Sequence, residues 1–136
     1  AGYMRVLRAE FISRFRDRII NIYPSLLPDF RGLDVQRAAL EAGVKFAGCT
    51  VHYVEEEVDA GPIIAQAVVP VLAGDTVETL SARILTEEHK LLPAVVFGIA
   101  QGNIELLRLG DKKIVRIDSD LIDSTTEAGV PILKNP

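Results

Sequence analysis

Asn21 and Tyr23 are the residues whose types and spacing first indicate chemistry. They stand two residues apart at the end of an apolar, β-branched run, and in extended backbone such residues leave the same face of a strand. An amide and a phenol placed together offer two hydrogen-bond donors to one bound atom. For an isolated pair the structural interpretation is preferred, in which Asn21 satisfies backbone groups and Tyr23 is a half-buried aromatic residue. The residues around this pair have to decide between the structural and the chemical interpretation.

A short strand and a proline-bracketed loop position this pair. Residues Ile19–Ile22 have the composition of a buried strand, and Pro24 forbids its continuation as a central strand. The loop Tyr23–Leu33 follows, and its two prolines and its glycine fix its path at low entropic cost. Before the strand, apolar residues at helical spacing predict a helix over about Ala9–Arg16.

An acidic loop between two strands is the next feature. Asp34 is placed to cap a helix over Val35–Ala42, and the glycine after it is a natural left-handed terminator. Residues Cys49–Val54 and Ile63–Leu72 have the alternation and composition of strands, although a proline interrupts the second. The segment between these strands, residues 55–61, is acidic and ends in a glycine.

The longest expected helix covers about Thr76–Gln101. Asp75 with Glu78 resembles a capping box at its start, and Pro93 should kink or break it. A hairpin is expected after it, with strands at Ile104–Leu107 and Ile114–Ile117. The chain after Asp118 is weakly patterned, and we treat residues 111–136 as a C-terminal tail.

Composition narrows the classes of protein. With 136 residues and 49% hydrophobic content, the chain can bury one core and is best interpreted as a single domain or part of one. The net charge of −4 argues against nucleic-acid or membrane-surface binding. Asp17 and the arginines around it indicate the solvated face of a helix. The single cysteine, Cys49, fits a reducing compartment, so we expect a cytoplasmic protein. There is no apolar run long enough to span a membrane.

A longer motif places Asn21 and Tyr23 in a family. Its parts are Asn21 to Pro28, Phe30 to Gly32, Gly48 to His52, Asp59 to Ile64, and Gln66. With this motif, the stretch from Ala1 to about Leu106 resembles the C-terminal half of phosphoribosylglycinamide formyltransferase, a folate-dependent enzyme family of purine biosynthesis. Glu87-Glu88-His89 and Ala1-Gly2-Tyr3-Met4-Arg5 favour this family over its relatives that share the main motif.

The resemblance implies three catalytic roles. In formyl transfer an amine attacks the formyl carbon of 10-formyltetrahydrofolate, and the carbonyl oxygen becomes an oxyanion. The family pattern makes Asn21 the oxyanion donor and Asp59 the proton relay acting through water. Tyr23 occupies the position of the family's histidine. A phenol with a pKa near 10 does not carry protons at neutral pH, so we expect chemistry slower by about one to three orders of magnitude.

The resemblance also implies which segments bind the substrates. The folate donor would contact the apolar segment Met4, Arg5, Val6 and Leu7, the catalytic Asn21, and the loop of Glu55, Glu56, Glu57, Val58 and Asp59. The nucleotide would contact Leu85, Thr86, Glu87 and Glu88, with Glu88 accepting from its ribose hydroxyls. Read without the family, these segments are an apolar strand end, a solvated charge run and an exposed helix face.

His52 has a structural and a functional interpretation. On a strand it is more often a core histidine with satisfied hydrogen bonds than a ligand. Its functional role would be to orient Asp59. His52 and His89 are the two histidines of the chain, which is thin support for a metal site, and we expect no metal.

The predicted fold is α/β: the C-terminal part of a Rossmann-like formyltransferase fold, with a mixed sheet and flanking helices, over residues 1–136. The family's N-terminal half, with its glycine-rich phosphate loop, is not in this sequence. A parallel sheet cut at Ala1 leaves an open strand edge. We therefore expect a homodimer or association with the missing half, small-molecule substrates, and no nucleic-acid or membrane partner.

Two alternatives stay open. The substitution at Tyr23 and the missing half fit a noncatalytic folate-binding module or a decayed enzyme. The shared motif also fits a formyltetrahydrofolate hydrolase or another formyltransferase of the superfamily, such as one acting on initiator tRNA or an amino sugar. The tRNA version should show a basic face, which this acidic chain lacks.

Overall fold

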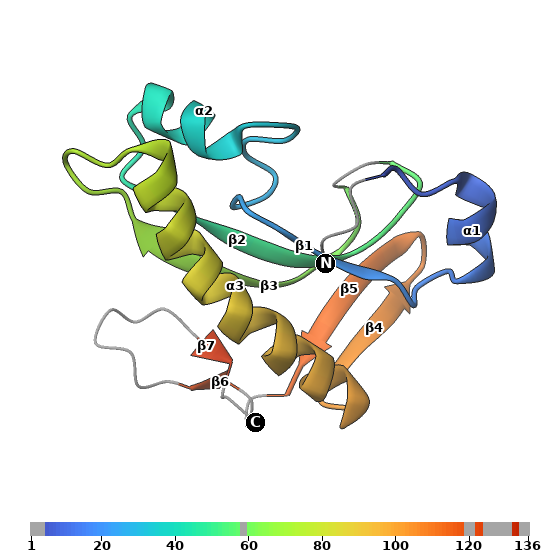
Figure 1. The fold of residues 1–136 in the computed structure, drawn as a ribbon. Helices are drawn as coiled ribbons and strands as arrows, with labels where there is room; N and C mark the ends of the chain where they lie inside the picture. The colour runs from blue at the N-terminus through green and yellow to red at the C-terminus, as the bar shows by residue number, and fades with distance from the viewer. Residues whose placement is uncertain (1–4, 58–59, 119–121, 124–131, 134–136) are drawn as a thin grey trace.

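The computed structural model describes residues 5–57, 60–118, 122–123 and 132–133. Its elements in chain order are α1 (Ala9–Arg14), β1 (Ile20–Tyr23), α2 (Val35–Ala42), β2 (Phe46–Tyr53), β3 (Ile63–Pro70), α3 (Val77–Ala100), β4 (Ile104–Leu109), β5 (Lys112–Ile117), β6 (Ile122–Asp123) and β7 (Ile132–Leu133). The expected helices and strands are present, with ends shifted by a few residues. Figure 1 shows α3 running across the sheet, with the β4–β5 hairpin near α1.

The central sheet contains β1, β2 and β3 in that order. β2 is its middle strand, and every residue of β2 except Phe46 is buried. Both pairings are antiparallel, so the parallel part of the expected sheet is not found among the described strands. The connection between β2 and β3, residues 54–62, is too short for the crossover that a parallel pair needs. β1 lies at the edge of this sheet.

Helix α3 covers one face of the sheet and closes the core. Its residues Leu80, Ile84 and Val95 are almost completely buried, and they pack in one cluster with Cys49 and Val51 of β2. Burying an aliphatic side chain of this size contributes about 1.5 to 3 kcal/mol relative to leaving it exposed, so this face fixes the helix on the sheet.

Pro93 was expected to kink or break α3, and it does not break the helix, which continues through it to Ala100. Proline removes one helical hydrogen bond. Here Leu91, Ala94 and Val95 are all buried on either side of it. Packing of these neighbours against the core therefore maintains the helix across the missing bond.

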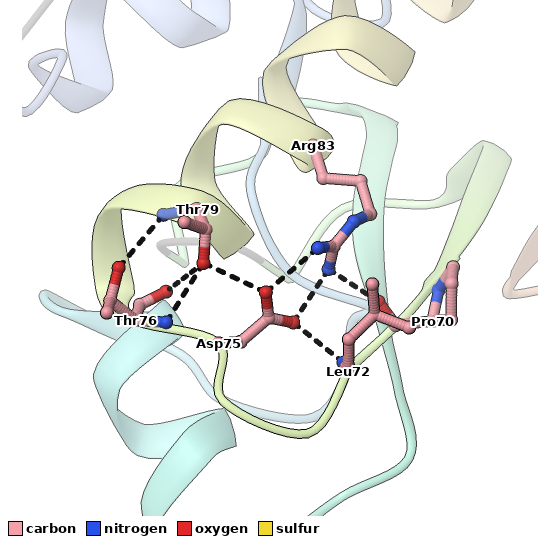
Figure 2. Close-up of polar contacts among 6 residues, drawn as sticks. All are labelled: Pro70, Leu72, Asp75, Thr76, Thr79 and Arg83. Atoms are coloured by element: carbon pink, nitrogen blue, oxygen red, sulfur yellow. Dashed lines mark hydrogen bonds and ion pairs between the residues drawn. The ribbon is translucent and has the colours of Figure 1, made fainter.

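The start of α3 also differs from the expected capping box of Asp75 and Glu78. Thr76 is the N-cap residue, and its hydroxyl accepts from the backbone N–H of Thr79 at 3.2 Å. In return the hydroxyl of Thr79 accepts from the N–H of Thr76 at 2.9 Å. The box is therefore made by two threonines one residue further along, as Figure 2 shows.

Asp75 instead joins the end of β3 to α3. Its carboxylate accepts two hydrogen bonds from the guanidinium of Arg83, at 2.7 and 2.8 Å, and one from the N–H of Leu72 at 2.7 Å. The same guanidinium donates to the carbonyl of Pro70 at 2.8 Å (Figure 2). The hydrogen bonds from Arg83 lower the pKa of Asp75 well below its ordinary value. This ion pair anchors the helix start on the sheet.

Helix α2 has the predicted bounds but not the predicted cap. Asp34 is its N-cap residue, yet its backbone is left-handed with φ 55°, and its side chain makes no capping hydrogen bond. A side-chain cap needs an extended N-cap residue, which explains the difference. Gly43 ends the helix in the left-handed conformation, as predicted.

Asp17 is not on the solvated face of a helix. Helix α1 ends at Arg14, and Asp17 follows it with φ 62°, a conformation that aspartate tolerates better than most residues. Its carboxylate accepts from Arg108 of β4 and Lys113 of β5. The hairpin is thereby tied to the segment between α1 and β1.

Candidate active site

The side chains on the two faces of β1 have different surroundings. Ile20 and Ile22 lie opposite Tyr53 and Val51 of β2 and pack on the core under α3. Asn21 and Tyr23 alternate with them and therefore point to the other face, because successive strand side chains change sides. The prediction that Asn21 and Tyr23 share a face of a strand is confirmed.

The loop after β1 is fixed to the sheet by neutral hydrogen bonds. The hydroxyl of Thr50, which is fully buried, donates to the carbonyl of Ser25 at 2.7 Å and accepts from the N–H of Leu27 at 3.0 Å. The side-chain amide of Gln66 donates to the carbonyl of Leu27 at 2.9 Å and to the Thr50 hydroxyl at 3.0 Å. Thr50 and Gln66 are cross-strand partners in β2 and β3. Two central strands therefore determine where the loop lies.

Sequence reasoning assigned no role to Thr50 and Gln66, although both lie in the motif. The available signal was chemical: each is a polar residue inside a strand of apolar neighbours. A buried polar group costs free energy unless it is hydrogen-bonded, so such residues usually have a definite partner. Here the partner is the backbone of the loop next to the candidate catalytic residues.

The hydroxyl of Tyr23 donates to the backbone carbonyl of Gly32. The phenol thus links the strand end to the far side of the same loop. To act on a formyl oxygen, the hydroxyl would have to exchange this partner for the substrate. The role of Tyr23 as a donor to the substrate stays a prediction.

His52 is buried opposite Asn21, with 2% of its surface exposed. Its Nδ1 lies 2.8 Å from the carbonyl oxygen of Tyr53, so Nδ1 carries a proton. Within the described residues Nε2 has no hydrogen-bond partner. A neutral ring with this tautomer accepts at Nε2, so orienting the Asp59 carboxylate would require a proton there as well. That role also stays a prediction, and Asp59 lies outside the described residues.

The acidic loop borders a cavity of about 250 Å³. Glu55, Glu56 and Glu57 line it together with residues near the end of α1. The remaining lining residues are Ile12, Ser13, Arg16, Asp17, Val54 and Lys113. The cavity lies beside the loop that was expected to bind folate. Val58 and Met4, two further residues of the expected folate site, lie outside the described residues.

Gly61 closes the acidic loop onto β2. A Cβ atom at Gly61 would lie 1.6 Å from the carbonyl oxygen of Tyr53, which only glycine avoids. The N–H of Tyr53 donates to the carbonyl of Pro62 at 2.9 Å. The two ends of the loop are therefore held at a fixed separation.

The other expected binding segments are placed separately. Arg5 and Val6 are exposed and Leu7 is half-buried. Leu85, Thr86, Glu87 and Glu88 lie on α3, which packs on the face of the sheet away from Asn21 and Tyr23. Glu87 pairs with Lys90 at 2.9 Å, while burial raises the pKa of Glu88. The role of these segments in substrate binding stays a prediction.

Other kinds of site find little support in the described part of the chain. No three His, Cys, Asp or Glu side chains described here are grouped so as to hold a metal ion. Burial raises the pKa of Cys49 to about 12, so its thiol stays protonated and is a poor nucleophile. No described helix combines the length and apolarity needed to cross a membrane.

Comparison with known proteins identifies the family. The formyl transferase family model matches residues 1–96. The chain therefore belongs to the formyl transferase family. Its α/β fold, deduced from the sequence, is confirmed by a crystal structure of phosphoribosylglycinamide formyltransferase from Anaplasma phagocytophilum, with a TM-score of 0.80 and 52% identity over 86% of this chain and 56% of that one.

Two curated relatives are longer than this chain. It is 45% identical over 106 residues to the phosphoribosylglycinamide formyltransferase of Escherichia coli, covering 78% of this chain and 50% of that protein. It is 50% identical over 110 residues to the trifunctional purine biosynthetic protein adenosine-3 of Gallus gallus, covering 81% of this chain and 11% of that protein. The chain thus spans about half the length of the bacterial relative.

Proposed function

We propose that the chain carries the reacting groups of an enzyme that transfers a formyl group from 10-formyltetrahydrofolate to the amine of glycinamide ribonucleotide. Membership of the formyl transferase family and the names of its relatives support the reaction class. The observation that carries the proposal is the display of Asn21 and Tyr23 on one face of β1, beside a loop fixed by Thr50 and Gln66. This arrangement preorganises donors before a substrate binds.

Asn21 would act on the developing negative charge. As the amine attacks the formyl carbon, the carbonyl oxygen becomes an oxyanion, and the side-chain amide donates a hydrogen bond to it. A preorganised donor of this kind lowers the barrier without any transfer of a proton. Asn21 lies opposite a buried histidine, so its strand position is well defined.

Asp59 and Tyr23 complete the proposed mechanism. Asp59, acting through a water molecule, takes the proton that the amine loses and returns one to N10 of the folate, whose bond to the formyl carbon breaks. Tyr23 donates a neutral hydrogen bond where the family has histidine. Charge-assisted hydrogen bonds are roughly twice as strong as neutral ones, so turnover should be slower.

The two substrates would have to meet at Asn21, because the amine of the nucleotide must reach the formyl carbon. The cavity beside Glu55, Glu56 and Glu57 has the volume for part of the folate donor. Glu88 would accept from the ribose hydroxyls of the nucleotide. Because burial raises its pKa, Glu88 should lose its charge at a higher pH than an ordinary glutamate, and nucleotide binding should weaken over the same range as the pH falls.

The test is formyl transfer by the full-length protein, with folate binding recorded alongside. We expect Tyr23→His to raise kcat by about 10- to 1000-fold with folate binding unchanged. Tyr23→Phe is the matched control, because it keeps the ring and removes the donor, and it should lower kcat. Product analysis separates formylated nucleotide from formate, which a hydrolase would release.

Folate binding without turnover is the second candidate, and the hydrogen bond from Tyr23 to Gly32 favours it. In that case the phenol serves to hold the loop. The same assay decides between the two: if neither the wild type nor Tyr23→His transfers the formyl group while both bind folate, the transferase proposal is wrong.

A further inference from the structure

Lys113 connects three segments that are far apart in the sequence. Its ammonium group lies 2.8 Å from Asp17 Oδ1 and 2.7 Å from Glu55 Oε1. Asp17 belongs to the turn between α1 and β1, Glu55 to the start of the acidic loop, and Lys113 to β5. Arg108, on the neighbouring strand β4, also donates to Asp17. We call Asp17, Glu55, Arg108 and Lys113 the ionic clamp.

Three side chains of the ionic clamp are partly buried, unlike those of an isolated surface ion pair. The side chains of Asp17 and Lys113 are 23% and 24% exposed, and that of Glu55 is 38% exposed. Partly buried groups with several hydrogen bonds hold their geometry better than isolated exposed ion pairs, whose contribution to stability is small. The hydrogen bond that Lys113 donates to Asp17 lowers the pKa of Asp17, and the hydrogen bonds that Lys113 donates to Asp17 and Glu55 raise the pKa of Lys113, as expected for a tight arrangement.

The clamp acts on one end of the acidic loop. At the far end Gly61 and Pro62 are held against Tyr53. At the near end Glu55 is tied through Lys113 to Asp17, and both residues line the cavity of about 250 Å³. Lys113 itself lines that cavity. The spacing between these two lining residues therefore depends on a residue from a different part of the chain.

We propose that Lys113 is a positioning residue for the folate-binding loop, which sets the width of the cavity by holding Glu55 against Asp17. The proposal rests on the proposed function of this cavity as the site of the folate donor. The β4–β5 hairpin would thus contribute to donor binding, although no motif in it was assigned a role. A site held by such support loses affinity when the support is removed.

The experiment compares Lys113→Met with Lys112→Met in the full-length protein. Lys112 is the adjacent, exposed lysine of the same strand, so its variant controls for loss of charge. We expect Lys113→Met to raise KM for 10-formyltetrahydrofolate roughly tenfold, with kcat and the nucleotide KM changed by less than about twofold. Lys113→Arg should restore most of the donor affinity, and Lys112→Met should behave as wild type. Equal rises in both KM values, or no change, would overturn the proposal.

A double-mutant cycle tests whether Lys113 acts through Glu55. Glu55→Gln alone should weaken donor binding, and adding Lys113→Met should have a much smaller effect than it has in the wild type. If Glu55→Gln leaves donor binding intact while Lys113→Met weakens it, Lys113 contacts the ligand directly and the positioning role is wrong.

Amide hydrogen exchange separates the clamp from the proposed function. Lys113→Met should increase exchange at residues 54–57 without ligand, whereas Lys112→Met should not. If the wild type binds no folate, the proposed function fails, yet this measurement still decides whether the clamp orders the loop. Unchanged exchange at residues 54–57 would refute the clamp whatever the ligand is.

Discussion

The loop after β1 and the loop after β2 are held in place by different kinds of contact. The loop after β1 is fixed by the buried, neutral side chains of Thr50 and Gln66, which bond to its backbone. The loop after β2 is fixed at one end by a close approach at Gly61 and at the other by Lys113, through partly exposed charges. Both loops adjoin the residues proposed to act on the substrates.

The two kinds of contact should hold their loops with different strength. Buried neutral hydrogen bonds are insensitive to salt and costly to leave unmade, so they suit a frame that must not move. Partly exposed ion pairs contribute less to stability and weaken with salt and at extreme pH, so they hold a segment less firmly under those conditions. The proposed reacting pair, Asn21 and Tyr23, lies beside the loop held by neutral contacts, and the proposed donor cavity lies beside the loop held by ion pairs.

Gly61→Ala should have the largest effect, because it opens the acidic loop at its rigid end. The new Cβ would lie 1.6 Å from the carbonyl oxygen of Tyr53, so the backbone has to move. A displacement of about 1 Å in a catalytic segment costs on the order of 100-fold, and we expect at least that loss in kcat/KM for formyl transfer. The assay is the same as for Tyr23→His.

Gly102→Ala is the control for this prediction. A Cβ at Gly102 meets no atom within 4 Å, although its φ of 77° makes alanine strained there. The variant should lose about 1 kcal/mol of stability and keep its activity. Near-normal activity of Gly61→Ala would show that the close approach at Gly61 does not fix the end of the acidic loop.

Thr50→Val should have the next largest effect and tests the neutral frame. Valine has nearly the same shape, but the carbonyl of Ser25 and the N–H of Leu27 lose their partner in a fully buried position. We expect the free energy of unfolding to fall by about 2 to 3 kcal/mol, measured by urea denaturation.

Two further variants serve as controls for Thr50→Val. Thr50→Ser keeps the hydroxyl and should recover most of the loss. Thr86→Val removes an exposed hydroxyl that donates to the carbonyl of Ala82 inside α3, and it should change stability by less than about 0.5 kcal/mol. If Thr50→Val is as stable as Thr86→Val, the loop after β1 is not held as we describe.

Much of the architecture could be predicted because local chemistry dictates it. The β-branched runs became β1, β2 and β3, and the helix bounds followed from periodicity and terminating glycines. Asn21 and Tyr23 could be placed on one face because strand alternation is a local property. The family motif added the expected roles, which no local rule could supply.

What could not be predicted depends on contacts between distant residues. Pro93 stays within α3 because the core packs around it. Asp75 was expected to cap α3 but binds Arg83 instead. Asp17 was assigned to a solvated helix face, whereas Lys113, 96 positions away, holds it. Such partners are set by tertiary structure, which a single sequence read along the chain does not reveal.

Asp17→Asn should have the smallest effect and shows whether the acidic loop depends on charge. Asparagine also tolerates the φ of 62°, so the change removes mainly the charge. Because Lys113 lowers the pKa of Asp17, the contribution of this carboxylate is complete above its ordinary pKa and is lost as the pH falls through the lower folded value. The raised pKa of Lys113 means that its contribution is complete below its ordinary pKa and is lost as the pH rises through the higher folded value. The difference in Tm between wild type and Asp17→Asn should therefore be a few degrees between about pH 5 and 9, and should shrink towards both extremes and in about 1 M salt. Differential scanning fluorimetry across this pH range measures the difference in Tm.

Thr50→Val is the comparison, because its loss of Tm should not respond to salt. A loss of Tm in Asp17→Asn that is independent of pH and salt would mean that shape, rather than charge, fixes the acidic loop.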